Sequence, residues 1–170
     1  MFSGCNSLTT APELPATTLS IQCYNSMFNG CTSLVTAPAL PATTLANYCY
    51  SSMFSGCTSL VTAPELPATT LAARCYYFMF RKCNSLTTAP ELPATTLTDY
   101  CYYYMFNSCT SLNYVKAMFT STTQSNYKSS LDYWLNSVSS TGTFVKNSEA
   151  TWTNSECGIP SGWTVQTASS

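Results

Sequence analysis

Ten cysteines and three glutamates stand out in this chain of 170 residues by their chemistry and their spacing. Nine of the cysteines fall at intervals that alternate between 18 and 8 residues, and they form two series: Cys5, Cys31, Cys57, Cys83 and Cys109, and Cys23, Cys49, Cys75 and Cys101. The tenth is Cys157. Glu13, Glu65 and Glu91 share a third series, in which Ala39 occupies the remaining place.

The cysteine series allow three interpretations. Zinc fits poorly, because histidine is absent and no two cysteines are separated by only two to four residues. Disulfides would use all ten if paired Cys5–Cys23, Cys31–Cys49, Cys57–Cys75, Cys83–Cys101 and Cys109–Cys157. A helical path of about 12 Å between Cys23 and Cys31 argues against that pairing, since bridged Cα atoms lie within about 7 Å. The third interpretation is two ladders of buried thiols that act as small hydrophobic residues. Disulfides and free thiols both stay open.

Catalysis has few candidate residues. Without histidine there is no Ser-His-Asp or Cys-His arrangement, and no glycine-rich phosphate loop is present. Glu65 and Glu91 would lie about 5 Å apart on adjacent strands, where they would form an acid/base pair or a Ca²⁺ site. The alternative is two solvated loop carboxylates. We expect no enzyme, no cofactor and no metal site.

One repeating unit, which begins at a cysteine of the first series and has a Met-Phe pair near its end, determines where these side chains lie. Met-Phe recurs at residues 1, 27, 53, 79 and 105, a constant step of 26, and four full copies follow without gaps: residues 5–30, 31–56, 57–82 and 83–108. A fifth copy begins at Cys109 and then departs from the pattern. A fixed period of this length is typical of a protein built by stacking one small unit.

Each copy predicts one helix and one short strand. In the second copy, apolar residues fall on one half of a helix of about a dozen residues, and they are Leu45, Cys49, Tyr50, Met53, Phe54 and Cys57. Gly30 and Gly56 suit the left-handed residue that follows a helix. The segment SLVTAP predicts a strand ended by proline, as at Pro38. We therefore expect an α/β solenoid, a right-handed coil with short parallel strands on one face and helices on the other.

The spacing C-x-x-L, the proline-linked L-P and the M-F-x-x-C segment resemble the BspA-type (Treponema pallidum-type) leucine-rich repeats over residues 1 to about 119. The endings TGTFVKN (141–147) and GIPSGWTVQ (158–166) resemble those of surface repeat proteins of gut Bacteroidetes. The resemblance implies a leucine-rich-repeat fold and a cell-surface or secreted adhesion protein. It implies no catalytic residue.

We expect residues 1–119 to form the repeat solenoid and residues 120–170 to cover its end as part of the same domain. Leu131–Val138 predicts an amphipathic capping helix, and TGTFVKN and GWTVQ predict edge strands. The first residues align with the end of a repeat and no signal peptide precedes them, so we expect a fragment of a longer protein. No stretch is apolar enough to span a membrane.

The positions that vary between copies indicate where a partner would bind. Serine and asparagine in the first copies give way to aromatic residues later, and Arg74 lies between two of them in the series. The candidate binding residues are Tyr48, Tyr77, Phe78, Tyr100, Tyr103 and Tyr104. Such a patch suits protein or sugar recognition, whereas packing against the cap is the structural alternative.

We therefore expect a non-catalytic extracellular recognition or adhesion module for a protein or glycan partner. A net charge of −1 gives no footprint for nucleic acid. A structural repeat module of a surface or phage appendage and an accessory domain of a larger enzyme are the alternatives.

Overall fold

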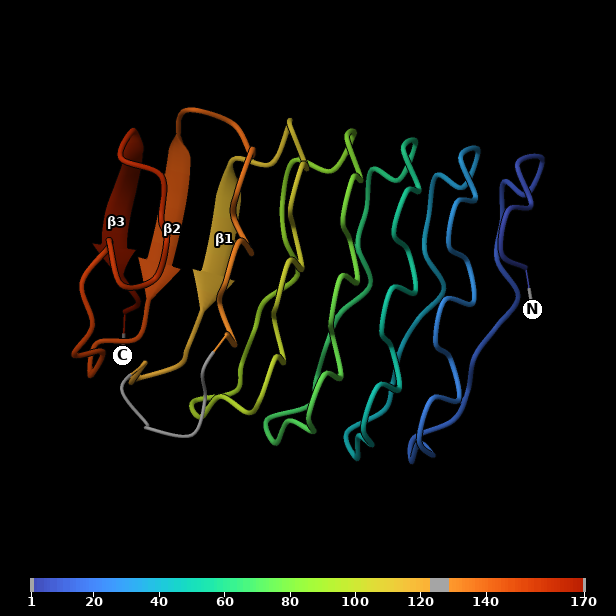
Figure 1. Cartoon of the computed structure of the whole chain (residues 1–170), viewed down its shortest axis with the longest axis horizontal. Helices are drawn as coiled ribbons and strands as arrows, with labels where there is room; N and C mark the ends of the chain where they lie inside the picture. The colour runs from blue at the N-terminus through green and yellow to red at the C-terminus, as the bar shows by residue number, and fades with distance from the viewer. Residues whose placement is uncertain (1, 123–128, 170) are drawn as a thin grey trace.

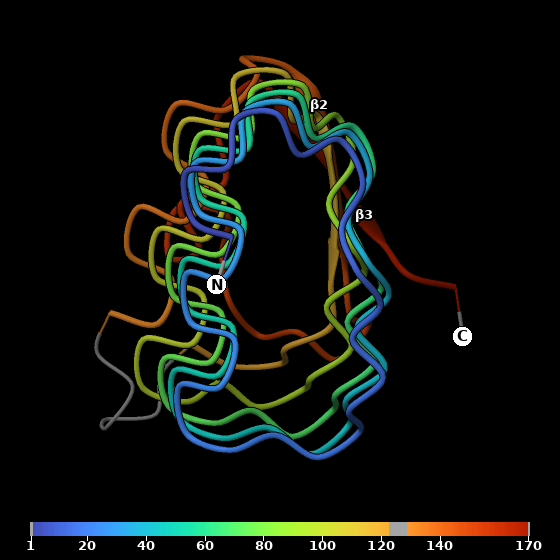
Figure 2. The ribbon, with the colours of Figure 1, turned by 90° about the vertical axis from the view of Figure 1, so that its right-hand side faces the viewer.

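The computed structural model describes residues 2–122 and 129–169, and it shows a stack of coils built from turns and short parallel strands. Successive copies lie side by side along the long axis of the molecule (Figure 1). Seen along the stack, the coils overlap as ovals, with strands on one long side and folded-back turns on the other (Figure 2). We call these the strand side and the turn side.

The expected helices are absent from the described residues, so the prediction of an α/β solenoid with a leucine-rich-repeat layer of helices is wrong. The segments assigned to helices form consecutive four-residue turns instead. The amide of Met27 donates to the carbonyl of Tyr24 at 3.2 Å, and Ser26 between them has a φ of 53°. A positive φ at the third residue is the geometry of a type II turn.

Alternate amides in these turns bond to the next coil rather than to their own. Tyr24 N donates to Cys49 O at 3.0 Å, and Phe28 N donates to Met53 O at 3.0 Å. The rings of Phe28 and Phe54 consequently stack with their centroids 5.7 Å apart. Packed helices need about 8–10 Å between their axes, so coils this close together leave no room for helices.

Three strands form at the C-terminal end of the stack: β1 (Tyr114–Ala117), β2 (Gly142–Lys146) and β3 (Trp163–Thr167). They make a parallel sheet in the order β1-β2-β3, with Val115 opposite Phe144 and Phe144 opposite Val165. β2 lies within the expected strand TGTFVKN, and β3 overlaps the expected strand GWTVQ and extends one residue beyond it, although β2 is central rather than at an edge. The predicted capping helix at Leu131–Val138 is wrong, because those residues continue the turns.

In the earlier copies the strand side is joined by isolated parallel bridges, such as Thr10 with Thr36 and Thr36 with Thr62. The SLVTAP segments therefore pair in register but remain too short to count as strands. Between the two sides lies one apolar core, which contains the columns of phenylalanine, tyrosine, methionine, leucine and cysteine. At the C-terminal end Trp134, Phe144 and Trp152 close the core by ring contacts.

Candidate functional site

Both cysteine ladders are present, and all ten cysteines are free thiols. Only Cys5 and Cys23 are exposed; the other eight are buried. In the first ladder each buried thiol donates to a phenylalanine carbonyl of the preceding coil, as Cys57 does to Phe28 O at 3.1 Å and Cys109 to Phe80 O at 2.9 Å. Burial raises the pKa of Cys57 and that of Cys109 to about 12. These thiols are therefore neutral packing groups, unsuited to nucleophilic chemistry.

The second cysteine ladder lies beside a column of stacked tyrosines. The rings of Tyr50, Tyr76 and Tyr102 are stacked 6.0 Å apart and end on the indole of Trp134. Burial raises the pKa of each phenol, and all three hydroxyls are buried without a hydrogen-bond partner. This column lies inside the core and offers no surface to a ligand.

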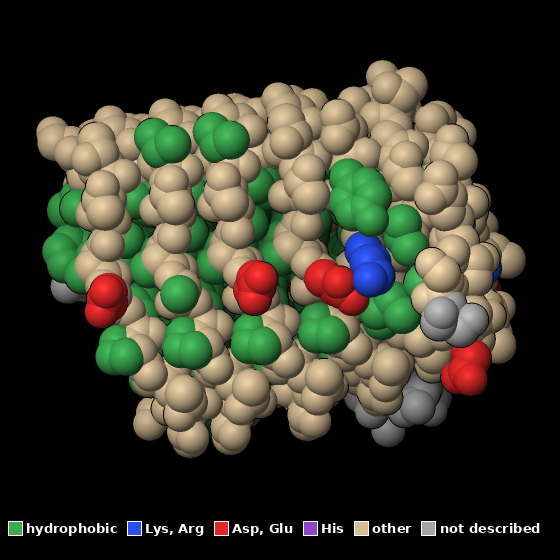
Figure 3. Space-filling model, turned by 180° about the vertical axis from the view of Figure 1, so that it is seen from behind, with side chains coloured by type: hydrophobic (Ala, Val, Ile, Leu, Met, Phe, Trp, Pro, Cys, Tyr) green, Lys and Arg blue, Asp and Glu red, His purple; other side chains and the backbone are tan. Residues whose placement is uncertain are grey.

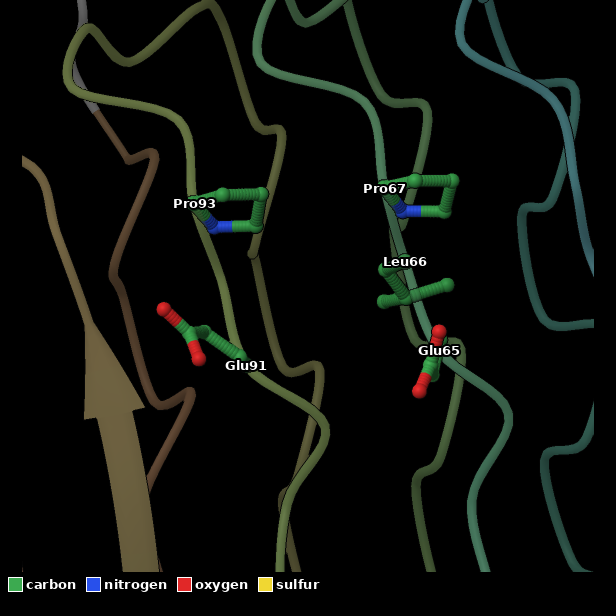
Figure 4. A pocket seen from close by; sticks show the side chains of 5 residues that line it. All are labelled: Glu65, Leu66, Pro67, Glu91 and Pro93. Atoms are coloured by element: carbon green, nitrogen blue, oxygen red, sulfur yellow. The ribbon is translucent and has the colours of Figure 1, made fainter.

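The glutamate series lies on the strand side, where rows of like side chains run along the stack (Figure 3). A shallow pocket of about 410 Å³ there is lined by Glu65, Leu66, Pro67, Glu91 and Pro93. Within it, the carboxylate of Glu91 points away from Glu65 (Figure 4). It forms an ion pair with the Lys116 ammonium, at 3.0 Å from Nζ to Oε1.

The two glutamates are therefore not arranged as an acid/base pair. Across residues 2–122 and 129–169, no group of three or more histidine, cysteine, aspartate and glutamate side chains gathers as a metal site. In the same residues, no helix meets the length and apolarity needed to cross a membrane.

The six aromatic candidates come together on the turn side, with Tyr48 in the second copy and the other five in the third and fourth copies. Tyr77 stacks on Tyr103 with ring centroids 5.1 Å apart, and Phe78 lies 4.9 Å from Tyr104. Edge-on contacts join Phe78 to Tyr77 at 4.3 Å and Tyr100 to Tyr103 at 5.5 Å. Tyr48 is connected to these rings through Arg74, whose guanidinium carbon lies 5.3 Å from the centroid of the Tyr48 ring. We call these six residues, with Arg74, Arg81 and Tyr133, the aromatic face.

The aromatic face is half-exposed rather than packed beneath other residues. Tyr77, Phe78, Tyr103 and Tyr104 are all of intermediate exposure, and Tyr133 is 56% exposed. Partial burial raises the pKa of Tyr77, although the neighbouring Arg74 charge acts in the opposite direction. The phenol therefore stays protonated at neutral pH and is able to donate a hydrogen bond.

The turns explain how these side chains reach the surface. Many residues of the aromatic face are the left-handed residue of a turn. Their φ values lie between 53° and 58°, and they are Tyr48, Arg74, Phe78, Tyr100, Tyr104 and Tyr133. Glycine or asparagine is the usual choice there, since a bulky residue costs roughly 1–2 kcal/mol. Arg74 lies between the rings of Tyr48 and Tyr100, 4.4 Å from the Tyr100 centroid.

Two residues of this face were missing from the sequence candidates. Tyr133 contacts Tyr104 at 4.8 Å, but it follows the fourth copy and does not fall at the constant repeat step from Tyr104. The Arg81 guanidinium lies 5.6 Å from the Phe78 centroid. Searching the segment after the fourth copy for the same kind of turn would have placed Tyr133 on the face.

Comparison with protein-family models, with curated proteins and with solved structures finds no match to this chain. The resemblance to BspA-type repeats therefore stays a prediction about sequence family, and the helical fold that it implied is wrong.

Proposed function

We propose that this protein is a non-catalytic recognition module that binds a protein or glycan partner through the aromatic face. The supporting observation is one continuous, half-exposed surface of tyrosine and phenylalanine on the turn side, from Tyr77 and Phe78 to Tyr133. Tyrosine-rich surfaces suit recognition because the ring buries apolar area while its hydroxyl keeps a hydrogen bond.

The backbone supports a binding role for these residues. At the position of Phe78 and Tyr104, the first and second copies carry Ser26 and Ser52, with the same left-handed φ. The turn is therefore made equally well without a ring. Residues that cost conformational energy and are not needed for the turn are candidates for function.

An extracellular or cell-surface location is part of this proposal and rests on the family resemblance alone. The structural alternative, a stalk or appendage module, is supported by the unbroken phenylalanine column from Phe2 to Phe106, which needs no binding face. The two proposals differ in whether the turn side of the third and fourth copies binds anything.

A glycan and matrix-protein array tests the proposal with three proteins. The double variant Tyr77→Ser/Tyr103→Ser introduces at both positions the residue type that the second copy carries at Ser51. The control Val35→Thr/Val61→Thr removes exposed apolar groups from the strand side, where Thr9 and Thr87 occupy the same position.

We expect the wild type and the control to bind the same ligand and the tyrosine variant to lose that binding at least tenfold. Equal binding by all three proteins, or no binding by the wild type, would contradict a recognition role for the aromatic face. Thermal unfolding of each variant verifies that all three are folded.

A further inference from the structure

We propose that the partner of the aromatic face is an acidic protein segment, whose carboxylates bind Arg74 and Arg81 while its apolar side chains contact the tyrosine edges. This inference rests on the proposed function and specifies its partner.

Positive charge is concentrated on this part of the molecule. Of the six lysine and arginine residues in the chain, Arg74, Arg81 and Lys82 all belong to the third copy. The first and second copies have Gln22 and Tyr48 at the position of Arg74, and glycine at the position of Lys82. The repeat scaffold therefore does not need these cations, and the third copy alone carries them.

The guanidinium of Arg74 lies between two tyrosine rings, one against each of its faces. It lies 5.3 Å from the Tyr48 centroid and 4.4 Å from the Tyr100 centroid, one coil to either side. Ring contacts on both faces leave the N–H edge of the guanidinium for a ligand, and that edge matches the two oxygens of a carboxylate. Within the described residues the single ion pair is Lys116 with Glu91, on the strand side, so Arg74 has no carboxylate partner there.

Arg81 provides a second, independent indication. Its Nε is buried and makes no hydrogen bond, and its guanidinium lies over the Phe78 ring at 5.6 Å. This Nε is out of reach of a ligand, but the Arg81 side chain as a whole is half-exposed. A carboxylate would therefore bind the terminal nitrogens of its guanidinium and compensate a charge for which the described residues supply no ion pair. Arg74 and Arg81 flank Tyr77 and Phe78 along one coil, which places an apolar centre between two cations.

The ring geometry favours a protein segment over a polysaccharide. Sugars stack on open ring faces, but Tyr77 and Tyr103 already stack on each other with an angle of 6° between their planes. The face of Phe78 is taken by Arg81, and faces of Tyr48 and Tyr100 are taken by Arg74. These contacts occupy at least one face of each of these rings, and the ring edges and hydroxyls suit peptide side chains and backbone.

Two carboxylates limit where an acidic segment would bind. Asp99 lies in the fourth copy beside Arg74, whose amide donates to the Asp99 carbonyl at 2.9 Å. Asp132 lies beside Tyr104, whose amide donates to the Asp132 carbonyl at 3.0 Å. The cationic part of the face is thus the third copy, and the acidic segment should lie along that coil rather than across the stack.

The test uses the full chain and a random copolymer of glutamate and tyrosine as the acidic protein probe, with polygalacturonate as an anionic polysaccharide. The variant Arg74→Gln/Arg81→Asn introduces the residue types that the first copy carries at Gln22 and Asn29, so the turns keep side chains that they already accept. Lys116→Gln removes one cation from the strand side as a control.

We expect the wild type to bind the copolymer with an affinity that falls as salt rises from about 50 to about 300 mM. The arginine variant should bind more than tenfold more weakly, whereas Lys116→Gln should match the wild type. Tighter binding of polygalacturonate than of the copolymer, or unchanged binding by the arginine variant, would overturn the acidic-segment inference.

The aromatic double variant separates this inference from the proposed function. If Tyr77→Ser/Tyr103→Ser abolishes binding to an array ligand while the arginine variant retains it, the face recognises a partner but not through its cations. If neither variant changes any binding, both proposals fail together.

Discussion

A left-handed backbone angle at every fourth residue decides which side chains reach the turn side of this protein. Residues 22, 26 and 30 in the first copy, and their counterparts in later copies, all have a positive φ. Gly30 and Gly56 meet this requirement without strain, with φ values of 72° and 77°. The sequence had predicted left-handed glycines at these two positions, and this prediction is confirmed although no helix precedes them.

The residues directly after these corners, such as Cys49, Met53 and Cys57, lie in the core, and there each thiol of the first ladder has one defined role. In the first ladder a buried cysteine donates a second hydrogen bond to a phenylalanine carbonyl inside the stack. Phe54 O, for example, accepts the Cys57 amide at 3.0 Å and lies 3.2 Å from the Cys83 sulfur. A thiol is small enough to fit between coils and still donates a weak hydrogen bond. The sequence left free thiols and disulfides open. Its distance argument against disulfides used a helical path that the described residues do not contain, although the thiols are free.

Burial of these thiols makes stability depend on pH in the alkaline range. The pKa of Cys57 and that of Cys109 rise from the ordinary 9.0 to about 12, since burial penalises the thiolate. Below pH 9 both states keep their protons and the folded state has its full stability. Between pH 9 and about 12 the unfolded chain ionises first, so the free energy of unfolding should fall with rising pH, by about 1.4 kcal/mol per pH unit for each such thiol.

Urea unfolding measured from pH 8 to pH 11 checks this expectation. Cys57→Ala should give a shallower pH dependence than the wild type, even if the variant is less stable overall. Cys5→Ala, which removes an exposed thiol, should leave the slope unchanged. A slope that is identical in all three proteins would show that the buried thiols do not control alkaline stability.

At the scale of elements, the turns and a helix share one apolar pattern. The spacings of four, five, eight, nine and twelve from Leu45 fit one half of a helix, but at a period of four the same residues fall into two columns. Cys49 and Met53 lie in one column, and Tyr50 and Phe54 lie in the other. The pattern alone does not distinguish the two structures; the close approach of neighbouring coils does, and this distance is a tertiary property.

Strands β2 and β3 were easier to anticipate than the turns because their residues are specific to the C-terminal segment, whereas β1 was not predicted. The β-branched and aromatic run TFV in β2 and the run WTV in β3 predict strands independently of the structure that the repeat adopts. Register depends on a close contact that the sequence does not display. An added Cβ at Gly142 would lie 2.5 Å from Asn113 O and 2.7 Å from Cε2 of Trp163.

Gly142→Ala should therefore destabilise the C-terminal sheet. Neither neighbour is free to move, because Asn113 O accepts the Thr143 amide at 2.8 Å and the Trp163 indole donates to Ser139 O at 2.8 Å. We expect a loss of about 2–3 kcal/mol in the free energy of unfolding, measured by chemical denaturation. Thr164→Ala, at an exposed position of β3, should change it by less than about 0.5 kcal/mol. Equal stability of Gly142→Ala and the wild type would contradict this expectation, because it would mean that the sheet accommodates the added methyl group without loss of free energy of unfolding.

For the whole molecule, each coil is bound on two sides by the same set of contacts. Phenylalanine rings stack at 5.6 to 5.7 Å from Phe2 to Phe106, and backbone bonds connect equivalent residues of neighbouring coils throughout. Stability in such a stack is approximately the sum of unit and nearest-neighbour terms. The constant repeat step predicted this stacking correctly, because the period is a property of the sequence itself.

Removing one complete copy should consequently leave a folded protein. If residues 31–56 are deleted and Gly30 is joined to Cys57, the Tyr24 amide meets the carbonyl of Cys75, the acceptor that Tyr50 uses at 3.0 Å. The phenylalanine column also closes, with Phe28 on Phe80. One interface is lost, so we expect a decrease of a few kcal/mol and a thermal midpoint lower by about 10 °C.

Deleting half a copy, residues 31–43, provides the control, because it sets turns of one coil against strand-side residues of the next. That protein should not unfold cooperatively, whereas the 31–56 deletion should do so and should give a far-UV circular dichroism spectrum without the double minimum of an α-helix. Similar behaviour of the two deletions would show that the register between copies does not hold the stack together. A helical spectrum of the intact protein would contradict the stacked turns, since coils 5.6 to 6.0 Å apart at their rings exclude helices.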